Sequence, residues 1–211
     1  MRENVRDTRE LILETAEKLF YEKGYDNTSV RELSSATGLS VAGIYYFFAD
    51  KEELLYTVLN RTIAGLNDSM RNGNAACSDV SQKIRNTIRN LLLYSIRKDR
   101  ELNVLNREAM RLTEEHRTQI NMTRGIGREE LTRELIAYTE QQQLTDADIR
   151  YASFVIFSQT AWFTRWFSIR DEKELDRFAR RIFEMMDGAL RLTSAGSQRC
   201  EREAAADTDI L

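Results

Sequence analysis

The sequence predicts an all-α protein. Its 211 residues contain no proline, and apolar residues recur at a helical period of roughly 3.6 along most of the chain. No segment alternates Val or Ile with polar residues in the manner of a half-buried strand. Because 42% of the residues are hydrophobic, the chain can bury apolar cores, and the pattern favours about nine helices.

The first helix is expected over residues 2–23. Gly24, which follows it, can adopt the left-handed conformation that ends many helices. The apolar stripe of this helix consists of Ile12, Ala16, Leu19 and Phe20. Its acidic residues Glu14, Glu17 and Glu22 are expected to face water.

Three more helices are marked by their capping residues. Ser29 and Glu32 have the spacing of a capping box, which opens a short helix that ends at Gly38. Ser40 caps a second short helix. Asp50 caps a longer helix, with acidic residues in its first turn that suit the helix dipole.

The rest of the chain extends the helical pattern. Small and polar residues at 71–79 indicate a loop. Further helices are predicted over 79–98, 101–113, 115–141, 145–169 and 171–194. We expect an N-terminal domain over 1–50, a second helical domain over 51–195, and a disordered tail over 196–211, where the apolar period is lost.

Composition excludes several classes of protein. No apolar run approaches the roughly 20 residues of a membrane-spanning helix, and the charged start of the chain is unlike a signal peptide. We therefore expect a cytoplasmic location. Cys77 and Cys200 have no cysteine or histidine at metal-binding spacing, so reduced thiols are expected rather than a disulfide framework or a zinc site.

The sequence lacks a constellation of catalytic residues. His116 is the only histidine, so neither a Ser/His/Asp triad nor a histidine metal site is supported, and we expect it at the surface. Gly125 and Gly127 lack the strand and spacing of a phosphate loop and are expected to kink a long helix. We predict no enzymatic activity, no catalytic residues, no metal and no cofactor.

Two short helices joined by a tight turn, with a long helix before them, have the proportions of a helix-turn-helix. This arrangement predicts that residues 1–50 bind double-stranded DNA. Residues 1–60 carry seven Lys and Arg against eleven Asp and Glu, a balance of 7 − 11 = −4, so contacts must depend on a few cations and backbone amides. The residues predicted to contact DNA are Thr28, Arg31, Ser40, Val41, Ala42, Gly43, Tyr45, Tyr46 and Lys51.

These residue types suit phosphate and groove contacts. Ser40 offers a hydroxyl and free amides to a phosphate, and Gly43 permits a close backbone approach. Tyr46 reaches a phosphate, while Tyr45 either does so or packs in the core. Lys51 clamps a phosphate or remains solvated, and Arg31 contacts DNA or pairs on the surface. Few side chains here donate directional hydrogen bonds. We therefore expect contacts with thymine methyl groups and recognition of DNA shape to contribute more to binding than bidentate hydrogen bonds to bases.

A dense set of residues over about 45 positions carries a family resemblance. The matching segments are Gly24, Thr28 to Leu33, Thr37 to Ser40, Gly43 to Phe48, and Asp50 to Leu55. They resemble the DNA-binding domain of TetR/AcrR-type repressors. Phe47 stands where many members have histidine, which removes one phosphate donor. The resemblance implies a homodimer, paired through its two C-terminal helices, with a ligand-binding domain after the DNA-binding domain.

The second domain is predicted to bind a small hydrophobic effector. Aliphatic, Met and aromatic side chains suit an elongated apolar ligand, because Met adapts to irregular shapes. The predicted lining is Leu92, Ile96, Leu105, Met110, Ile120, Met122, Phe154, Phe157, Ser158 and Trp162. Stripes of similar residues on the last two helices fill either a core within the subunit or the dimer interface.

A second resemblance concerns the effector. Several segments are similar to those of TetR-type regulators of fatty-acid and sterol breakdown: Arg107-Glu108, Glu115-His116-Arg117, Arg124, Glu129-Glu130, and Trp162 followed by Arg165-Trp166-Phe167. That similarity implies an acyl-CoA effector. The arginines that could meet its phosphates are Arg107, Arg111, Arg117, Arg124 and Arg128, and the alternative is that they pair with neighbouring glutamates.

The expected mechanism is repression relieved by ligand. A dimer would hold its recognition helices about 34 Å apart on a pseudo-palindromic operator. Ligand binding would favour a conformer in which the helix that begins near Asp50 pivots and weakens DNA binding. The alternative is a helical small-molecule-binding dimer without DNA activity.

Overall fold

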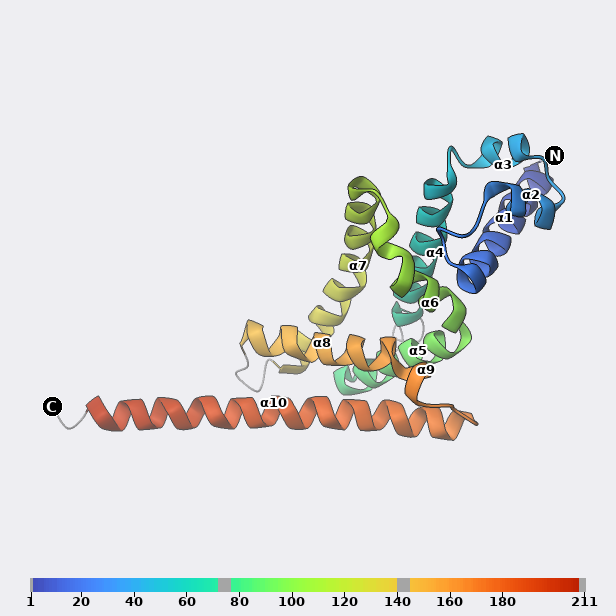
Figure 1. The fold of residues 1–211 in the computed structure, drawn as a ribbon. Helices are drawn as coiled ribbons and strands as arrows, with labels where there is room; N and C mark the ends of the chain where they lie inside the picture. Colours follow the sequence, from blue (N-terminus) through green and yellow to red (C-terminus); the bar gives the residue numbers. More distant parts are fainter. Residues whose placement is uncertain (1, 72–76, 140–144, 209–211) are drawn as a thin grey trace. The chain divides into compact units, whose positions relative to one another are not determined.

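The computed structural model describes residues 2–71, 77–139 and 145–208 (Figure 1). In those ranges the chain forms ten α-helices and one 3-10 turn and no strand, which confirms the all-α prediction. The first four helices are α1 (Arg2–Lys23), α2 (Val30–Thr37), α3 (Val41–Phe47) and α4 (Lys51–Arg71). After these come α5 (Val80–Arg97), α6 (Asp99–Glu108), η1 (Ala109–Arg111), α7 (Glu114–Thr139), α8 (Asp146–Ala161), α9 (Phe163–Trp166) and α10 (Glu172–Thr208).

The chain divides into two compact units. The N-terminal unit comprises residues 1–67 together with 97–126, and the C-terminal unit comprises 68–96 together with 127–211. α6 joins the N-terminal unit because it packs against α1. α7 contributes to both units, because the division falls between Ile126 and Gly127, within the pair of glycines expected to kink this helix.

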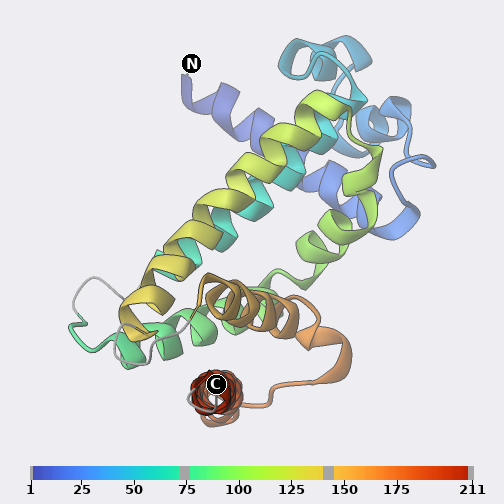
Figure 2. The same ribbon diagram turned by 90° about the vertical axis from the view of Figure 1, so that its left-hand side faces the viewer.

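Each of the first four helices contributes buried residues to the core of the N-terminal unit. Ile12 and Phe20 of α1, Leu33 of α2, Ile44 of α3 and Leu55 of α4 are all buried. In Figures 1 and 2 the first turns of α1 lie at the same end of this unit as α3. The short helices α2 and α3 are thus held by apolar contacts with the long ones, since helices of seven or eight residues are unstable alone.

Glu17 differs from the expectation that it faces water. Only 7% of the residue is exposed, and burial raises the pKa of its carboxyl. Arg61 of α4 donates hydrogen bonds to Glu17 at 3.1 Å and to Glu10 at 2.6 Å. The periodicity of α1 alone could not reveal this, because the partner lies 44 residues away.

Side chains from the end of α6 and from η1 stabilise the connection between α1 and α2. Arg107 donates to the backbone carbonyls of Phe20 and Tyr21, and Glu108 accepts the Tyr25 amide proton at 3.3 Å. The guanidinium of Arg111 lies 2.7 Å from the carboxylate of Asp26. Of the five arginines considered for CoA phosphates, Arg107 and Arg111 thus contact residues of the N-terminal unit.

His116 is half-buried rather than a plain surface residue. Its Nδ1 lies 2.6 Å from the Glu52 carboxylate, and its ring stacks on Tyr56 at 4.1 Å between centroids. Glu52 also accepts the backbone N–H of Thr113 at 2.7 Å. These contacts join the start of α7 to the first turns of α4 inside the N-terminal unit.

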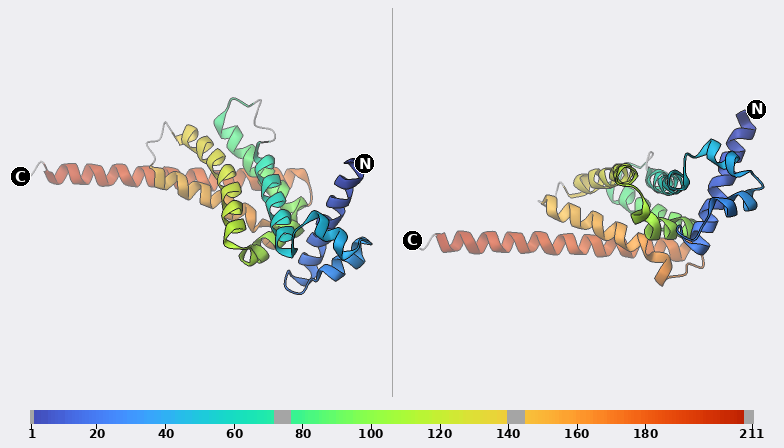
Figure 3. Two further views of the ribbon diagram at one scale, coloured as in Figure 1. Left: turned by 90° about the horizontal axis from the view of Figure 1, so that it is seen from above. Right: turned by 45° about the horizontal axis from the view of Figure 1, so that its top comes forward.

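In the C-terminal unit α8 packs along α10, an arrangement visible in Figures 1, 2 and 3. α8 begins with a capping box in which Thr145 and Asp148 exchange hydrogen bonds. Ile84 and Ile88 of α5, Leu135 of α7, Ile156 of α8 and Met186 of α10 are buried. The hydroxyl of Ser95 also donates to the Thr160 carbonyl at 3.0 Å.

Three predicted helices differ clearly from those observed. The helix expected over 101–113 corresponds to α6, which ends at Glu108 and is followed by η1. The helix expected over 145–169 ends at Ala161 and is followed by the single turn α9. α10 continues to Thr208, where a tail was expected, because residues 197–208 contain helix-favouring Ala, Glu and Arg and no proline. The loop expected at 71–79 is described only at its ends, since residues 72–76 lie outside the described ranges. No helix in the described ranges is long and apolar enough to cross a membrane.

Candidate nucleic-acid interface

The turn between α2 and α3 is determined by local capping. Ser29 accepts from the Glu32 amide at 3.2 Å, while the Glu32 carboxylate accepts from the Ser29 amide at 2.8 Å, which completes the predicted capping box. Gly38 ends α2 with φ +72°, a conformation that side chains other than glycine rarely adopt. Ser40 then caps α3 by accepting the Gly43 amide proton at 3.0 Å.

α3 presents a polar and aromatic face outward. Tyr46 is 78% exposed and Tyr45 47%, while Ser40 and Ala42 are also exposed. Ile44 is buried and anchors the helix from its other side. Tyr45 therefore does not pack in the core, which was the alternative considered for it. The arrangement is a short rod with hydroxyl groups at both ends of its exposed face.

Gly43 has a structural role inside α3. A Cβ atom at this position would lie 3.3 Å from the Ser40 hydroxyl oxygen, closer than ordinary van der Waals contact. Glycine thus allows the capping hydrogen bond to form, in addition to the close backbone approach expected from the sequence. Val41 is half-buried beside it.

Thr28 differs from the prediction that it contacts DNA. The residue is only 1% exposed, and its hydroxyl donates to the Gly24 carbonyl at 2.8 Å. Its amide donates to the Tyr25 carbonyl at 3.1 Å. Thr28 therefore stabilises the turn that leads into α2, and its side chain is out of reach of a duplex in this conformation.

Lys51 also makes internal contacts. Its ammonium donates to the carbonyls of Tyr25 and Thr28 at 2.8 and 2.9 Å and lies 4.1 Å from the centre of the Tyr25 ring. An ammonium has three N–H donors, so one remains for a phosphate. The lysine ties the first turn of α4 to the loop between α1 and α2.

Arg31 on α2 is exposed, and no ion pair is found for it in the described part of the chain. Its neighbour Glu32 instead pairs with Lys23 at 2.6 Å. The Lys23 ammonium and the Ser29 hydrogen bonds lower the pKa of Glu32 to about 2. Arg31 therefore provides an unpaired positive charge on the first helix of the helix-turn-helix.

Sequence reasoning missed one cation near α3. The Arg9 guanidinium lies 5.0 Å from the centre of the ring of Phe48, the residue that ends α3. Arg9 and Arg6 are exposed and lie one turn apart on the same face of α1. Their three-residue spacing was the signal available, but only the fold brings Arg9 against Phe48 at the end of α3.

The residues predicted to line the ligand pocket divide between the two units. Leu105, Met110, Ile120 and Met122 belong to the N-terminal unit, where both methionines are largely exposed. Leu92, Ile96, Phe154, Phe157, Ser158 and Trp162 belong to the C-terminal unit. Phe154 is 66% exposed and Trp162 49%, so neither faces an enclosed cavity in the single chain.

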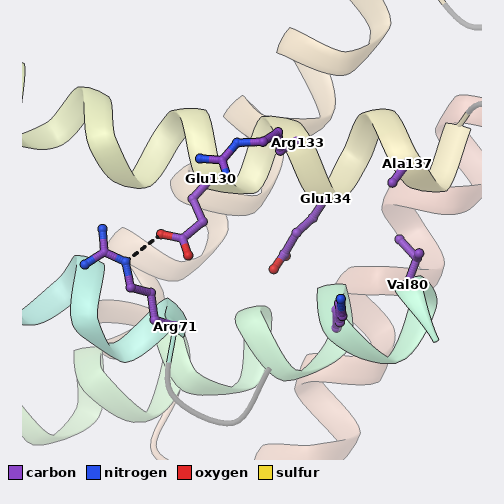
Figure 4. Close-up of a pocket in the computed structure, with 7 residues that line it drawn as sticks. Arg71, Val80, Glu130, Arg133, Glu134 and Ala137 are labelled. Carbon is purple, nitrogen blue, oxygen red and sulfur yellow. Dashed lines mark hydrogen bonds and ion pairs between the residues drawn. The ribbon is translucent and has the colours of Figure 1, made fainter. Parts of the chain in front are cut away.

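A cavity of about 520 Å³ occurs in the C-terminal unit (Figure 4). It is lined by Arg71, Val80, Lys83, Glu130, Arg133, Glu134 and Ala137. Arg71 pairs with Glu130 at 3.0 Å, and Glu134 accepts from the Thr87 hydroxyl at 3.0 Å. None of the predicted ligand residues lines this cavity. No group of three metal-ligating side chains occurs in the described ranges.

Comparison with known proteins identifies the family. Residues 12–58 match the model of the bacterial regulatory proteins of the tetR family, and residues 77–190, more than half of the chain, match the tetracyclin repressor-like C-terminal domain. The chain belongs to the tetR family of bacterial regulatory proteins. Family membership confirms the resemblance seen in residues 24–55.

Curated relatives match only a part of this chain. An uncharacterized HTH-type transcriptional regulator of Bacillus subtilis, YuxN, is 43% identical over 56 residues, which are 26% of this chain and 19% of that protein. A regulator of Staphylococcus aureus is 35% identical over 63 residues, 30% of this chain and 34% of that protein. The chain thus spans about a fifth to a third of these relatives.

Solved structures match over most of the fold. PfmR of Thermus thermophilus, a TetR-family regulator, has a TM-score of 0.71 at 28% identity, over 83% of this chain and 96% of that one. AibR, solved with isovaleryl coenzyme A and operator DNA, has a TM-score of 0.72 at 23% identity, over 83% and 98%. The fatty acid degradation regulator FadR of Bacillus halodurans has a TM-score of 0.71 at 20% identity, over 87% and 96%.

Proposed function

We propose that this tetR-family chain is a ligand-responsive transcriptional regulator that binds duplex DNA as a homodimer through α3 and is released by a small effector. The observation that carries the proposal is the exposed face of α3, which capping on both sides of the turn holds clear of the core. An exposed recognition helix of this kind fits the major groove.

The proposed DNA contacts come from two helices. Ser40, Ala42, Tyr45 and Tyr46 supply the exposed face of α3, and Arg31 supplies a free cation on α2. Val41 and Gly43 are half-buried and would meet base edges or sugars through small apolar groups. Lys51 would add one N–H to a phosphate while its other donors brace the loop.

Selection from a random duplex library tests DNA binding. The wild-type chain should enrich one sequence, and its affinity for that duplex should fall steeply as salt rises, because Lys and Arg contacts to phosphate release counterions. Absence of any enriched sequence would contradict the proposal and favour a helical ligand-binding dimer without DNA activity.

We place the dimer interface on the outer faces of α8 and α10. Tyr151 and Phe154 of α8, Trp166 of α9 and Met185 of α10 are all more than 60% exposed in the single chain. Water-exposed apolar side chains gathered on neighbouring helices are typical of a surface that a partner covers. In TetR-like proteins the partner is a second copy, which the mates of these helices would supply.

Phe154→Glu tests this interface. A charge buried between two subunits without a partner costs several kcal/mol, so the dissociation constant of the dimer should rise at least roughly 100-fold. Gln159→Glu is the matched control, because it adds the same charge on an exposed position on another side of α8. Analytical ultracentrifugation measures the dissociation constant of the dimer. The same value for the wild type and Phe154→Glu would exclude this face of α8 from the interface.

We propose that the effector carries an apolar chain and an anionic group, with an acyl-CoA as the specific candidate. AibR, whose solved complex contains isovaleryl coenzyme A, motivates this candidate. The cavity of the C-terminal unit offers Lys83 and Arg133, for which no ion pair is found in the described part of the chain. The apolar side chains of Val80 and Ala137, which line the same cavity, would meet part of the acyl chain.

Release by effector requires a difference in affinity between two conformations. A ligand that binds both conformations equally does not change their relative populations, however tightly it binds. Isovaleryl-CoA should therefore lower occupancy of the selected duplex, and free CoA and isovalerate should do so less. Equal occupancy with and without millimolar isovaleryl-CoA would remove acyl-CoA as a candidate while leaving DNA binding intact.

A further inference from the structure

We infer that the N-terminal turns of α1 form a second phosphate-contacting surface beside α3, with Arg9 as its principal cation and Arg6 as its second. This inference rests on the proposed DNA-binding function and assigns part of its electrostatic affinity to a helix outside the helix-turn-helix.

The charge balance of the N-terminal unit creates the need for such a surface. Residues 1–60 have a net charge of −4, and two of the cations whose side chains the structure describes make internal contacts. Lys23 pairs with Glu32 at 2.6 Å, and Lys51 donates to two backbone carbonyls. Arg31 is then the only cation with a free charge on α2, α3 and the connection between them. One guanidinium and the one remaining Lys51 donor per protomer are a small number of cationic contacts for binding that depends on phosphate neutralisation.

Arg9 is positioned to supply a further contact. Its guanidinium lies over the ring of Phe48, which ends α3 and is itself buried. Stacking uses the flat face of a guanidinium and leaves its N–H donors pointing outward in the plane of the group. No carboxylate pairs with Arg9 in the described part of the chain, so these donors are available to a phosphate.

Arg6 extends the same surface. It lies one turn before Arg9 on α1, is exposed, and has no ion pair in the ranges that the structure describes. Among the acidic residues that follow Arg6 on the helix, Asp7 lies on another face and Glu10 is held by Arg61 at 2.6 Å. Arg6 and Arg9 thus add two exposed positive charges to one face of α1, next to the contact of Arg9 with the end of α3.

Salt dependence of DNA binding separates this role from simple packing. The probe is the duplex selected with the wild-type chain, and affinity is measured by anisotropy between 50 and 200 mM KCl. Arg9→Gln should lower the slope of log K against log salt by about 1 for each protomer, so that its loss of affinity is roughly threefold larger per protomer at 50 mM than at 200 mM. Arg9→Lys, which keeps the charge, should retain most of the slope.

Lys18→Gln is the matched control on the same helix. Lys18 is exposed nine residues after Arg9, about half a turn around α1, and should leave the slope unchanged. Arg6→Gln should lower the slope as Arg9→Gln does, and it disturbs no ring contact. It therefore tests the surface even where loss of the Phe48 contact unfolds the Arg9 variants.

Two results would overturn the inference. One is a wild-type slope in both Arg9→Gln and Arg6→Gln, and the other is an equal loss of affinity in Arg9→Gln and Arg9→Lys with an unchanged slope, which would make Arg9 a packing residue only. Either result would leave the proposed function intact, whereas failure of the wild-type chain to bind any duplex would contradict the proposed function itself.

Discussion

The exposed aromatic and large apolar side chains of the two units differ in their surroundings. In the N-terminal unit Tyr45 and Tyr46 lie on one short helix, next to a capping serine and a free arginine. In the C-terminal unit Phe154, Trp166 and Met185 lie on three different helices. The first surface combines hydroxyl groups with a nearby cation and suits a polyanion, while the second offers a broad apolar area and suits another protein surface.

A charge placed on α3 should have the largest effect on function. Tyr46→Glu would put a carboxylate where phosphates are expected, and affinity for the selected duplex should fall roughly 100-fold, or about 2.7 kcal/mol. Because Tyr46 is 78% exposed, the melting temperature should hardly change. Met122→Glu, at an equally exposed position on α7, should bind DNA as wild type does. Fluorescence anisotropy of both variants with the selected duplex measures these affinities. An equal loss of affinity in the two variants would contradict a role of α3 in DNA binding.

The internal contacts of Lys51 predict a stability effect of intermediate size. Lys51→Ala removes hydrogen bonds to two carbonyls and the contact with the Tyr25 ring, so the free energy of unfolding should fall by about 2 kcal/mol. Urea unfolding of the full chain measures this. Wild-type stability of the variant would contradict the stabilising role of these contacts, while its salt slope tests the proposed phosphate contact separately.

Gly188 of α10 tests the apolar face of the C-terminal unit. A Cβ there would meet nothing within 4 Å in the single chain. In the monomeric Phe154→Glu background, Gly188→Ala should raise the free energy of unfolding by about 1 kcal/mol through helix propensity. In the wild-type dimer the gain should vanish, because the added methyl meets the partner helix. The same gain in both backgrounds, measured by urea unfolding, would exclude Gly188 from the interface.

The smallest effect is expected from the capping box of α2. The pKa of Glu32 is lowered from its ordinary 4.5 to about 2, chiefly by the Lys23 ammonium. Its contribution to stability is therefore fully present above pH 4.5 and is lost as pH falls towards 2. The melting temperature of Glu32→Gln should lie below that of wild type at pH 6 and meet it near pH 2. A constant difference across this range would mean that the Glu32 charge contributes nothing.

The two units also differ in how far sequence alone predicted them. The bounds of α1 and the caps at Ser29, Gly38 and Ser40 agree with the structure, because each depends on residues within a few positions. The proposed effector site depends on which distant helices meet, and no local signal reports that. The predicted lining therefore fell in both units.

The candidate DNA-contacting residues follow the same division. Exposure of Ser40, Tyr45 and Tyr46 follows from the helical period around buried Ile44. The burial of Thr28 and the carbonyl contacts of Lys51 do not, since they arise where α4 approaches the connection between α1 and α2. The position of Arg9 against Phe48 likewise joins residues 39 positions apart and could be found only in the fold.

Native mass spectrometry of the chain on its selected duplex tests the central claim most directly. We predict two chains per duplex, on a sequence whose half-sites form an inverted repeat with centres about 34 Å, one helical turn, apart. One bound chain on a site without such symmetry would contradict the account of a twofold dimer that reads DNA through α3.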